Sequence, residues 1–577
     1  MATQHVESQR RDGSRAPAHG APAGLSGGDG EAKAVAAVRI CAPDCGEWSP
    51  RVSSPEPTPA LQAIGRDAAR LLGQFSPIIL SNRAPVEPRS GGQLVSGAGG
   101  LVKALTSLAN ATKASWVSAA RTEIERELAA SGRSLGSDAN ADQAFPIFFA
   151  PTDPAAYDLH YAVISNPLLW FAHHYLWNIA IEPVVDQSIY KAWFDGYRVI
   201  NAAIAERALS ISRQLPRRPL FLTQDYQLYL APEHIRSALP DAAMQHFIHV
   251  PWPEPRYMKV LPAAMREGIF KGLLANDIIG LQTSLDVHNF LRCCVELMGL
   301  RVVEAEGAVL SGGRVVWVRA YPVSIDVDAM RQLGESPAVR ELEAEVAVWR
   351  PEKLIVRVDR TDPSKNLIRG FLAYERLLED HPEYQGRVTL WAFLQPSRQD
   401  VDAYRQYLEL VRSTVARINT RFGNEAWEPT RLDLGEDIHR ALAAYRSYDV
   451  LLVNPILDGM NLVAKEGPVV NQRSGVLVLS ESAGAHEELG THGVSINPFD
   501  VEVTARAIHR ALQMSPAERV ERSDAINQIV ATNDVARWIR HQLEDIRSIT
   551  PAFRGPFEPE GQSAGRGPGA QRTGRRR

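Results

Sequence analysis

The sequence is poor in cysteine, and this bears on where the protein works. Of its 577 residues only four are cysteines: Cys41, Cys45, Cys293 and Cys294. The pair Cys293 and Cys294 lies in an apolar, helix-like run and is typical of core residues. Cys41 and Cys45 have no second pair that would complete a metal site. So few cysteines do not indicate a disulfide framework, and we expect reduced thiols and a cytoplasmic location.

Long apolar runs and a strong net charge are also missing. No apolar run approaches the ~20 residues that a bilayer span needs, and the N-terminus lacks the apolar core of a secretory signal. We therefore expect no membrane partner. The net charge is −4, which argues against nucleic acid as a partner. Hydrophobic residues make up 45% and charged residues 23%, as in ordinary globular proteins.

The chain is too long for one hydrophobic core, so we expect at least two domains. Residues 1–72 are rich in Gly, Ala, Pro and Ser without a sustained period, which predicts a disordered extension. Residues 551–577 are similar and end in three arginines, which predicts a disordered basic tail. The organised part of the chain should therefore lie between these two segments.

Between the two ends, apolar strand-like runs alternate with helical segments in two series. The runs are 77–80, 220–223, 246–250 and 277–281, followed by 353–358, 388–394, 449–453 and 475–479. This alternation predicts an α/β protein with parallel sheets. The two series predict two doubly wound domains, 73–325 and 326–550. In such sheets ligands bind beyond the carboxyl ends of the strands.

The second series carries two informative polar stretches. Asp458 and Glu466 have seven intervening residues, follow a strand, and precede a helix start whose N–H groups suit an anionic or sugar ligand. The loop 359–366 holds Arg360 and Lys365, two cations that can neutralise a pyrophosphate leaving group. Solvated acids and a surface salt bridge are the alternative interpretations. Arg398 also follows a strand and is a further candidate phosphate ligand.

The first series ends its strands in comparable groups. Arg83 follows the first strand, and the glycine-rich loop 96–101 precedes a helical run, so both suit a phosphate. His249 and Asp225 lie at neighbouring strand ends, which makes them candidates for one site. The aromatic residues Tyr161 and Trp170 could flank a sugar ring, although core packing explains either of them equally well.

The sequence does not indicate a metal site or a cofactor. Asp326 and Asp328 form a DxD pattern, but they lie at the predicted domain boundary, and Arg360 and Lys365 already supply positive charge. No His/Cys/Asp cluster has zinc-ligand spacing, and no lysine context singles out a Schiff base for pyridoxal phosphate. We therefore expect no metal and no cofactor.

Together these motifs resemble the trehalose-6-phosphate synthases over roughly residues 75–545. The matching stretches, in family order, are 81–83, 99–101, 224–227, 249–253, 360–365, 454–471 and 479–489. The resemblance implies a GT-B fold, with two Rossmann-like domains facing each other across a cleft. It also implies a retaining, metal-independent transfer of glucose from a nucleotide sugar to glucose 6-phosphate.

The resemblance also implies a role for each matching residue. Catalysis and pyrophosphate binding would fall to Arg360, Lys365, Asp458 and His249. The donor would also contact Gly99, Gly100, Gly459, Met460, Asn461, Leu462 and Val463, with Glu466 on the ribose. The acceptor phosphate would be clamped by Arg83 and Arg398, and its sugar lined by Tyr161, Trp170 and Asp225.

The sequence departs from the commonest family pattern in two places. Gln224-Asp-Tyr-Gln227 replaces the usual His-Asp-Tyr-His, and Asp362-Pro-Ser-Lys-Asn366 replaces Asp-Tyr-Ser-Lys-Gly. Together with the run 466–471, these features resemble an actinobacterial branch and leave UDP or GDP open as the donor base. A pseudo-glycosyltransferase, a synthase with another phosphorylated acceptor such as glycerol 3-phosphate, and a non-catalytic sugar-phosphate-binding regulator stay open as alternatives. The subunit number also stays open, including a homo-oligomer.

Overall fold

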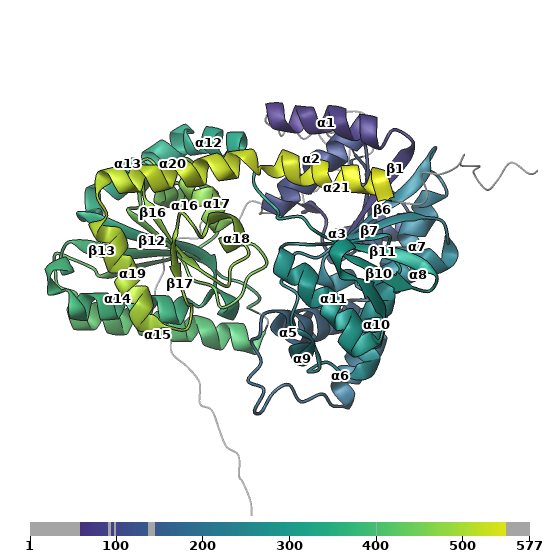
Figure 1. Cartoon of the computed structure of the whole chain (residues 1–577), viewed down its shortest axis with the longest axis horizontal. Helices are drawn as coiled ribbons and strands as arrows, with labels where there is room; N and C mark the ends of the chain where they lie inside the picture. Colours follow the sequence, from purple (N-terminus) through teal and green to yellow (C-terminus); the bar gives the residue numbers. More distant parts are fainter. Residues whose placement is uncertain (1–57, 90–93, 97–99, 137–144, 400, 550–577) are drawn as a thin grey trace, which may run out of the picture. The chain divides into compact units, whose positions relative to one another are not determined.

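The computed structural model describes residues 58–89, 94–96, 100–136, 145–399 and 401–549. All of them belong to one compact unit, Ser49–Arg577. The predicted tail 551–577 and most of the predicted extension, residues 1–57, lie outside the described residues. The described chain forms two large sheets, each with helices on both faces (Figure 1).

The first sheet has nine strands in the order β5-β4-β1-β6-β7-β8-β11-β10-β9. The strands are β1 Phe75–Ser81, β4 Ser115–Ala119, β5 Ile147–Ala150, β6 Arg218–Gln224, β7 Ala243–Phe247, β8 Ile278–Leu281, β9 Arg301–Val303, β10 Ala308–Ser311 and β11 Arg314–Ala320. All but the β9 and β10 edge pair in parallel. A separate hairpin joins β2 Val86–Pro88 to β3 Leu94–Ser96.

The second sheet has six parallel strands in the order β14-β13-β12-β15-β16-β17. They are β12 Lys353–Arg360, β13 Val388–Gln395, β14 Thr430–Leu434, β15 Val450–Val453, β16 Val476–Ser480 and β17 Val494–Ile496. Counted from β12, this is the order 3-2-1-4-5-6 of the dinucleotide-binding fold. The parallel strands of the first sheet follow the same pattern. The predicted α/β fold with two doubly wound sheets is therefore confirmed.

Helices connect the strands of both sheets. Those of the first part are α2 Gly100–Thr112, α3 Glu123–Ser131, α4 Pro154–Asp158, η1 Leu159–Trp170, α5 Phe171–His173, α6 Gln187–Lys191, η2 Ala192–Tyr197, α7 Arg198–Ser212, η3 Tyr226–Leu228, α8 Ala231–Ala238, α9 Pro255–Met258, α10 Ala263–Leu273, α11 Ser284–Met298 and η4 Glu304–Glu306. Those of the second part are α12 Val327–Gly334, α13 Pro337–Trp349, η5 Pro363–Lys365, α14 Leu367–Asp380, η6 Pro382–Tyr384, α15 Asp402–Phe422, α16 Ile438–Ser447, α17 Val463–Val470, α18 His486–Leu489, α19 Val501–Gln513, α20 Pro516–Thr532 and α21 Val535–Ile549.

Apolar side chains fix which helices cover which face of the second sheet. Leu367 of α14, Val411 of α15 and Ile508 of α19 pack in one buried cluster with strand residues such as Ile355. Helices α13, α16 and α17 pack on the opposite face, as Figure 1 shows. Because both faces are covered, the strands consist of nearly continuous apolar runs, as expected for a parallel sheet.

Part of the predicted disordered extension is helical, and here the structure differs from the prediction. Helix α1 spans Pro59–Leu71, and the Thr58 hydroxyl caps it by accepting the Leu61 N–H at 3.3 Å. Ile64, Ala68 and Leu71 form its buried face, which packs against α2 and α21. The buried face of α1 has only three apolar positions, and the segment is rich in alanine. This periodic pattern is too short to predict a helix from the sequence alone.

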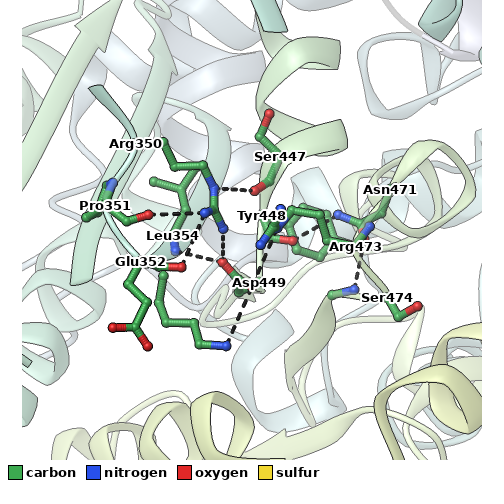
Figure 2. A network of polar contacts seen from close by, with 12 residues as sticks. Arg350, Pro351, Glu352, Leu354, Ser447, Tyr448, Asp449, Asn471, Arg473 and Ser474 are labelled. Atoms are coloured by element: carbon green, nitrogen blue, oxygen red, sulfur yellow. Dashed lines mark hydrogen bonds and ion pairs between the residues drawn. The ribbon is translucent and has the colours of Figure 1, made fainter. Parts of the chain in front are cut away.

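A dense ionic network lies at the amino end of the second sheet (Figure 2). Asp449, which is 2% exposed, forms an ion pair with Arg350 and lies 3.3 Å from Arg519, 3.6 Å from Arg473 and 3.9 Å from Lys353. It also accepts the Leu354 N–H at 3.0 Å. One buried carboxylate therefore holds several chain segments together at the edge opposite the strands' carboxyl ends.

The two cysteines predicted to be core residues, Cys293 and Cys294, are buried free thiols. Among the described residues, no helix is long and apolar enough to cross a membrane, and no cluster of His, Cys, Asp or Glu is arranged to hold a metal. The predicted cytoplasmic location and the division at residues 325 and 326 stay predictions.

Candidate active site

The strand order of each sheet creates one point where successive connections run in opposite directions, and ligands bind at such points. In the first sheet it lies between β1 and β6, whose ends lead to Arg83 and Asp225. In the second sheet it lies between β12 and β15, whose ends lead to Lys365 and Asp458. Parallel strands end at the same edge of their sheet, so the topology gathers the predicted site residues at two such points.

Lys365 and Asp458 form an ion pair at the second of these points. Their side chains are 13% and 15% exposed, and Asp458 also accepts the Asn461 side-chain N–H at 3.1 Å. Burial by itself would raise the pKa of Asp458, but the Lys365 ammonium holds it below its ordinary value. The Asp458 carboxylate thus stays ionised at neutral pH.

Two glycines beside Asp458, Gly459 and Gly484, lie so close to the neighbouring backbone that no side chain fits there. A Cβ on Gly459 would lie 2.1 Å from the backbone oxygen of His249, and a Cβ on Gly484 would lie 1.9 Å from that of Gly459. The N–H groups of residues 459–462 donate no hydrogen bond to any described part of the chain. They precede the start of α17, where amide dipoles favour an anion. Beyond them, Glu466 accepts the Tyr445 hydroxyl at 3.3 Å.

The remaining predicted donor residues divide between packing and site. Met460 is buried in the hydrophobic core, and Leu462 and Val463 are partly buried and pack against that core. Gly99 lies outside the described residues, and Gly100 begins α2. The glycine-rich loop before this helix therefore stays a prediction.

Arg398 is built into a buried polar network. Its Nη1 donates to Asp362 Oδ2 at 2.9 Å and to the Tyr404 hydroxyl at 2.5 Å, and its Nη2 donates to the Tyr226 hydroxyl at 3.4 Å. Asp362 is fully buried; burial opposes ionisation, yet Arg398, and then Arg360, lower its pKa to about 2. The carboxylate thus stays ionised and holds the guanidinium in place.

Trp170 is held in this network and is not open to a sugar ring. The Arg398 guanidinium lies 3.9 Å from its ring centroid, and the His174 ring stacks on it with centroids 4.0 Å apart. Two groups this close to one centroid must cover opposite faces. Trp170 Nε1 donates to Asp362 Oδ1 at 3.4 Å. The prediction that Trp170 lines the acceptor sugar is therefore limited to its edge, because both ring faces are covered.

Tyr161 connects the two arginines predicted to bind the acceptor phosphate. Arg83 Nη2 donates to its hydroxyl at 2.7 Å, and the guanidinium lies 5.1 Å from its ring centroid. Burial would raise the pKa of Tyr161, but Arg83 and Arg398 together bring it below the ordinary value. Both cations therefore act on one hydroxyl, and Arg83 itself is exposed. The site has a positively charged end on the side of the first sheet.

His249 is a neutral imidazole with both nitrogens occupied. Gln224 Oε1 lies 3.0 Å from its Nε2, and Gln282 Nε2 lies 3.5 Å from its Nδ1. Burial, with a smaller effect of His246, lowers its pKa to about 3. Asp225 accepts the His249 backbone N–H at 3.1 Å, and burial raises the pKa of Asp225 to about 6.

The structure thus brings Arg360, Lys365, Asp458, His249 and Arg398 into connected contacts. Arg360 lies 5.5 Å from the Trp170 ring centroid, and Gly459 packs on the backbone of His249. Sequence reasoning missed Asp362, Tyr404, His174 and Gln282. Asp362 lies in the charged loop 359–366 and could have been found there, whereas no pattern distinguishes the other three.

The unusual Asn366 has a local explanation. Its backbone has φ 56° and ψ 40°, the left-handed region that glycine adopts most easily, and asparagine is among the side chains that tolerate it best. Asn366 Nδ2 also donates to the backbone oxygens of Asn454 and Pro498, at 3.0 and 2.7 Å. It thus holds the loop after β12 against the loop after β15, although its side chain does not cap α14.

Comparison with known proteins places this geometry in a family. The model of glycosyltransferase family 20 matches residues 76–548. The alpha,alpha-trehalose-phosphate synthase [UDP-forming] 2 of Aspergillus fumigatus is 34% identical over 81% of this chain and 96% of its own length. The trehalose-6-phosphate synthase of Salmonella choleraesuis is 32% identical over 68% of this chain and 81% of its own length.

Solved structures agree with the sequence comparison. A trehalose-6-phosphate synthase structure from E. coli, bound with UDP-2-fluoro glucose, has a TM-score of 0.72 at 28% identity and covers 82% of this chain and 99% of its own. A UDP-forming synthase from Burkholderia xenovorans in complex with glucose-6-phosphate has a TM-score of 0.69 at 27% identity and covers 82% and 100%. The fold is therefore of the GT-B type, and the chain belongs to glycosyltransferase family 20 and is a glycosyltransferase.

Proposed function

We propose that this protein is an alpha,alpha-trehalose-6-phosphate synthase. It transfers glucose from a nucleoside diphosphate glucose to glucose 6-phosphate and retains the anomeric configuration. The observation that carries the proposal is the ion pair between Lys365 and Asp458 at the switch point of the second sheet. A cation and a carboxylate next to free backbone amides suit a ligand that is part anion and part sugar.

On the donor side, Lys365 and Arg360 bind the pyrophosphate, and their charge has its largest effect when the glycosidic bond breaks and negative charge develops. Asp458 and the amides of residues 459–462 hold the hexose, and Glu466 holds the ribose. His249 lies beside the donor sugar as a neutral group, because a pKa of about 3 excludes a cation there at neutral pH.

On the acceptor side, Arg83 and Arg398 bind the phosphate of glucose 6-phosphate on either side of Tyr161. A guanidinium suits phosphate because its N–H groups match two oxygens at once. Asp362 keeps Arg398 in position, so its orientation is set before the acceptor arrives. Asp225 and the edge of Trp170 contact the acceptor sugar.

The reaction then needs no protein nucleophile. The bond between C1 of the donor glucose and the β-phosphate oxygen breaks, and the departing phosphate stays on the same face. The acceptor hydroxyl attacks C1 from that face and forms the new C1–O bond, while its proton passes to a phosphate oxygen. Attack and departure on one face retain the configuration. In this proposal Lys365 and Arg360 stabilise the departing phosphate, and no carboxylate acts as a nucleophile.

The test mixes the purified protein with glucose 6-phosphate and, in turn, UDP-, GDP- and ADP-glucose. We expect one product with the mass of a disaccharide phosphate, and NMR should show both anomeric centres in the α configuration. Asp458→Asn, which keeps the size of the side chain, is the matched control and should form little product. No product with any donor, or product only with glycerol 3-phosphate as acceptor, would overturn the proposal.

A further inference from the structure

Hydrogen bonds to the backbone of Val323 connect the two sheets beside the candidate active site. We propose that Gln282 and Lys465 are positioning residues, which engage the backbone N–H and the carbonyl oxygen of Val323 and thereby fix His249 relative to the donor-binding helix α17. The inference rests on the proposed function, since it concerns the same two substrates. Neither residue touches a reacting atom, so both act through their neighbours.

The contacts begin at His249. Gln282 directly follows β8, is 1% exposed, and has both ends of its amide engaged. Its Nε2 faces His249 Nδ1 at 3.5 Å, and its Oε1 accepts the Val323 N–H at 3.0 Å. Because Oε1 must accept from the backbone, Nε2 must be the donor toward the ring. The ring therefore keeps its proton on Nε2, where Gln224 accepts it.

Val323 lies in the segment that links the two sheets, after β11 and before α12. Its carbonyl oxygen accepts a hydrogen bond from Lys465 Nζ at 3.0 Å. Lys465 belongs to α17, one residue before Glu466, which the proposal assigns to the donor ribose. The Val323 N–H thus donates to Gln282 and the Val323 carbonyl oxygen accepts from Lys465, so side chains from the two sheets engage both backbone groups of one residue.

Burying the Lys465 ammonium costs free energy, since a charged group strongly prefers water unless it is paired. It is 1% exposed, and burial lowers its pKa. Its partner is Glu488, whose other oxygen accepts the Asn533 side-chain N–H at 2.8 Å. The contacts are therefore continuous from His249 to Glu488 through named hydrogen bonds.

A second connection between the sheets lies beside the first. Asn533 lies between α20 and α21, and the Val535 N–H donates to the Ile325 oxygen at 3.0 Å. Trp538 of α21 donates its indole N–H to the Tyr321 oxygen at 3.2 Å. Lys465, through Glu488, thus contacts both connecting segments. Any change of angle between the sheets must alter these bonds.

The consequence is geometric. The donor must bind between His249 on one sheet and α17 on the other, and a misplacement of about 1 Å costs on the order of 100-fold in rate. Val323 lies between these two elements, and its N–H and its carbonyl oxygen are bonded to Gln282 and Lys465. Loss of either bond should lower kcat more than it raises either KM, because substrates can still bind but are held in a poorer orientation.

The test uses Gln282→Leu, Gln282→Glu and Lys465→Met in the full chain, with Lys271→Met as the matched control. Lys271 is 73% exposed in α10, so its loss should leave kcat within twofold. We expect Gln282→Leu and Lys465→Met each to lower kcat about tenfold. Because both residues act through the backbone of Val323, kcat of the double variant should also fall about tenfold, not a hundredfold.

Gln282→Glu separates positioning from packing. A carboxylate still accepts the Val323 N–H but cannot donate to His249 Nδ1. It should raise the pKa of the imidazole and add a pH-dependent limb to kcat that is absent from the parent protein and from Gln282→Leu. Besides Gln224 and Gln282, Asp225 accepts the backbone N–H of His249, and His246 lowers the pKa of the ring. These two are unchanged in all variants and cannot produce the new limb.

The outcomes are distinct. Parent-like kcat in Gln282→Leu, a multiplicative loss in the double variant, or no new limb in Gln282→Glu would each overturn the positioning role. If Lys465→Met does not fold, the two Gln282 variants still decide the question. A parent protein that forms no product refutes the proposed function instead, because the positioning test presupposes parent activity.

Discussion

Arg398 Nη1 lies 2.9 Å from Asp362 Oδ2, and the two side chains are only 8% and 0% exposed. This pair joins the loop after β13 to the loop after β12, and Trp170 and Tyr404 cover it. A buried ion pair contributes little net stability by itself, but removing one partner leaves an unneutralised charge. The pair therefore orients Arg398 at a cost that the surrounding network offsets.

We expect Asp362→Asn to lower the free energy of unfolding by about 3 kcal/mol and to lower kcat/KM for glucose 6-phosphate at least tenfold. The reason is that Arg398 loses its buried counter-ion and its fixed orientation. Urea unfolding and acceptor saturation kinetics measure the two effects. Glu352→Gln removes an exposed partner of Arg387 and serves as the control. Parent-like saturation by the acceptor would show that Asp362 does not position Arg398.

Lys365→Ala should lower kcat by about 100- to 1000-fold. A contact to the pyrophosphate strengthens as charge develops in the transition state, so kcat should change more than the KM of the donor. Steady-state kinetics with a saturating donor give the value, and the thermal unfolding midpoint checks that the fold is intact. Turnover close to that of the parent in a folded variant would remove Lys365 from the proposed mechanism.

Arg83→Ala should act mainly on the acceptor. Arg83 is exposed and contacts Tyr161, so its loss should not disturb the core. We expect the KM for glucose 6-phosphate to rise about tenfold, which corresponds to the loss of one charge-assisted hydrogen bond, while the KM of the donor stays unchanged. An unchanged acceptor KM would mean that the phosphate binds elsewhere.

Asp225 makes stability depend on pH in a definite direction. Burial raises its pKa from 3.8 to about 6, so the folded state binds the proton more tightly than the unfolded state. The associated stability is present below about pH 4 and is lost as pH rises through about 6. Compared with Asp225→Asn, the parent should lose about 2 kcal/mol over this range, since one pKa unit is worth 1.36 kcal/mol and partial exposure reduces the effect.

The measurement is urea unfolding of both proteins at pH 4.5 and pH 7.5. Asparagine also tolerates the positive φ of 69° at this position, so the variant should keep the backbone. Asp286, whose pKa burial also raises to about 6, contributes equally to both proteins and cancels in the difference. A difference that is constant with pH would contradict the raised pKa of Asp225.

Asp449→Asn should be the most destabilising change outside the active site. Arg350 and Arg519 are 14% and 11% exposed, and they would lose the carboxylate that they share with Arg473 and Lys353. We expect a loss of about 3 kcal/mol in the free energy of unfolding, with kcat unchanged at temperatures where the variant is folded. Unchanged urea unfolding would show that the network is not needed for stability.

The amino-acid pattern alone predicts the α/β class, the two series of strands, and the charged residues that follow the strands. Runs such as 353–358 and 449–453 are apolar because both faces of a parallel sheet are buried, and polar loops follow the strands where ligands bind. Arg360, Lys365 and Asp458 could therefore be found by reading which charged residues follow a strand.

Which of these groups meet, and which are already engaged by their neighbours, follows from the fold and not from the local pattern. The sequence suggests that Trp170 flanks a sugar ring, but Arg398 and His174 cover its two faces. No local pattern predicts the partners of Asp362, Gln282 and Lys465, because these partners are 36, 41 and 142 residues away in the chain. Burial and long-range contacts set the pKa and the orientation of a side chain, and neither is encoded in its immediate sequence neighbours.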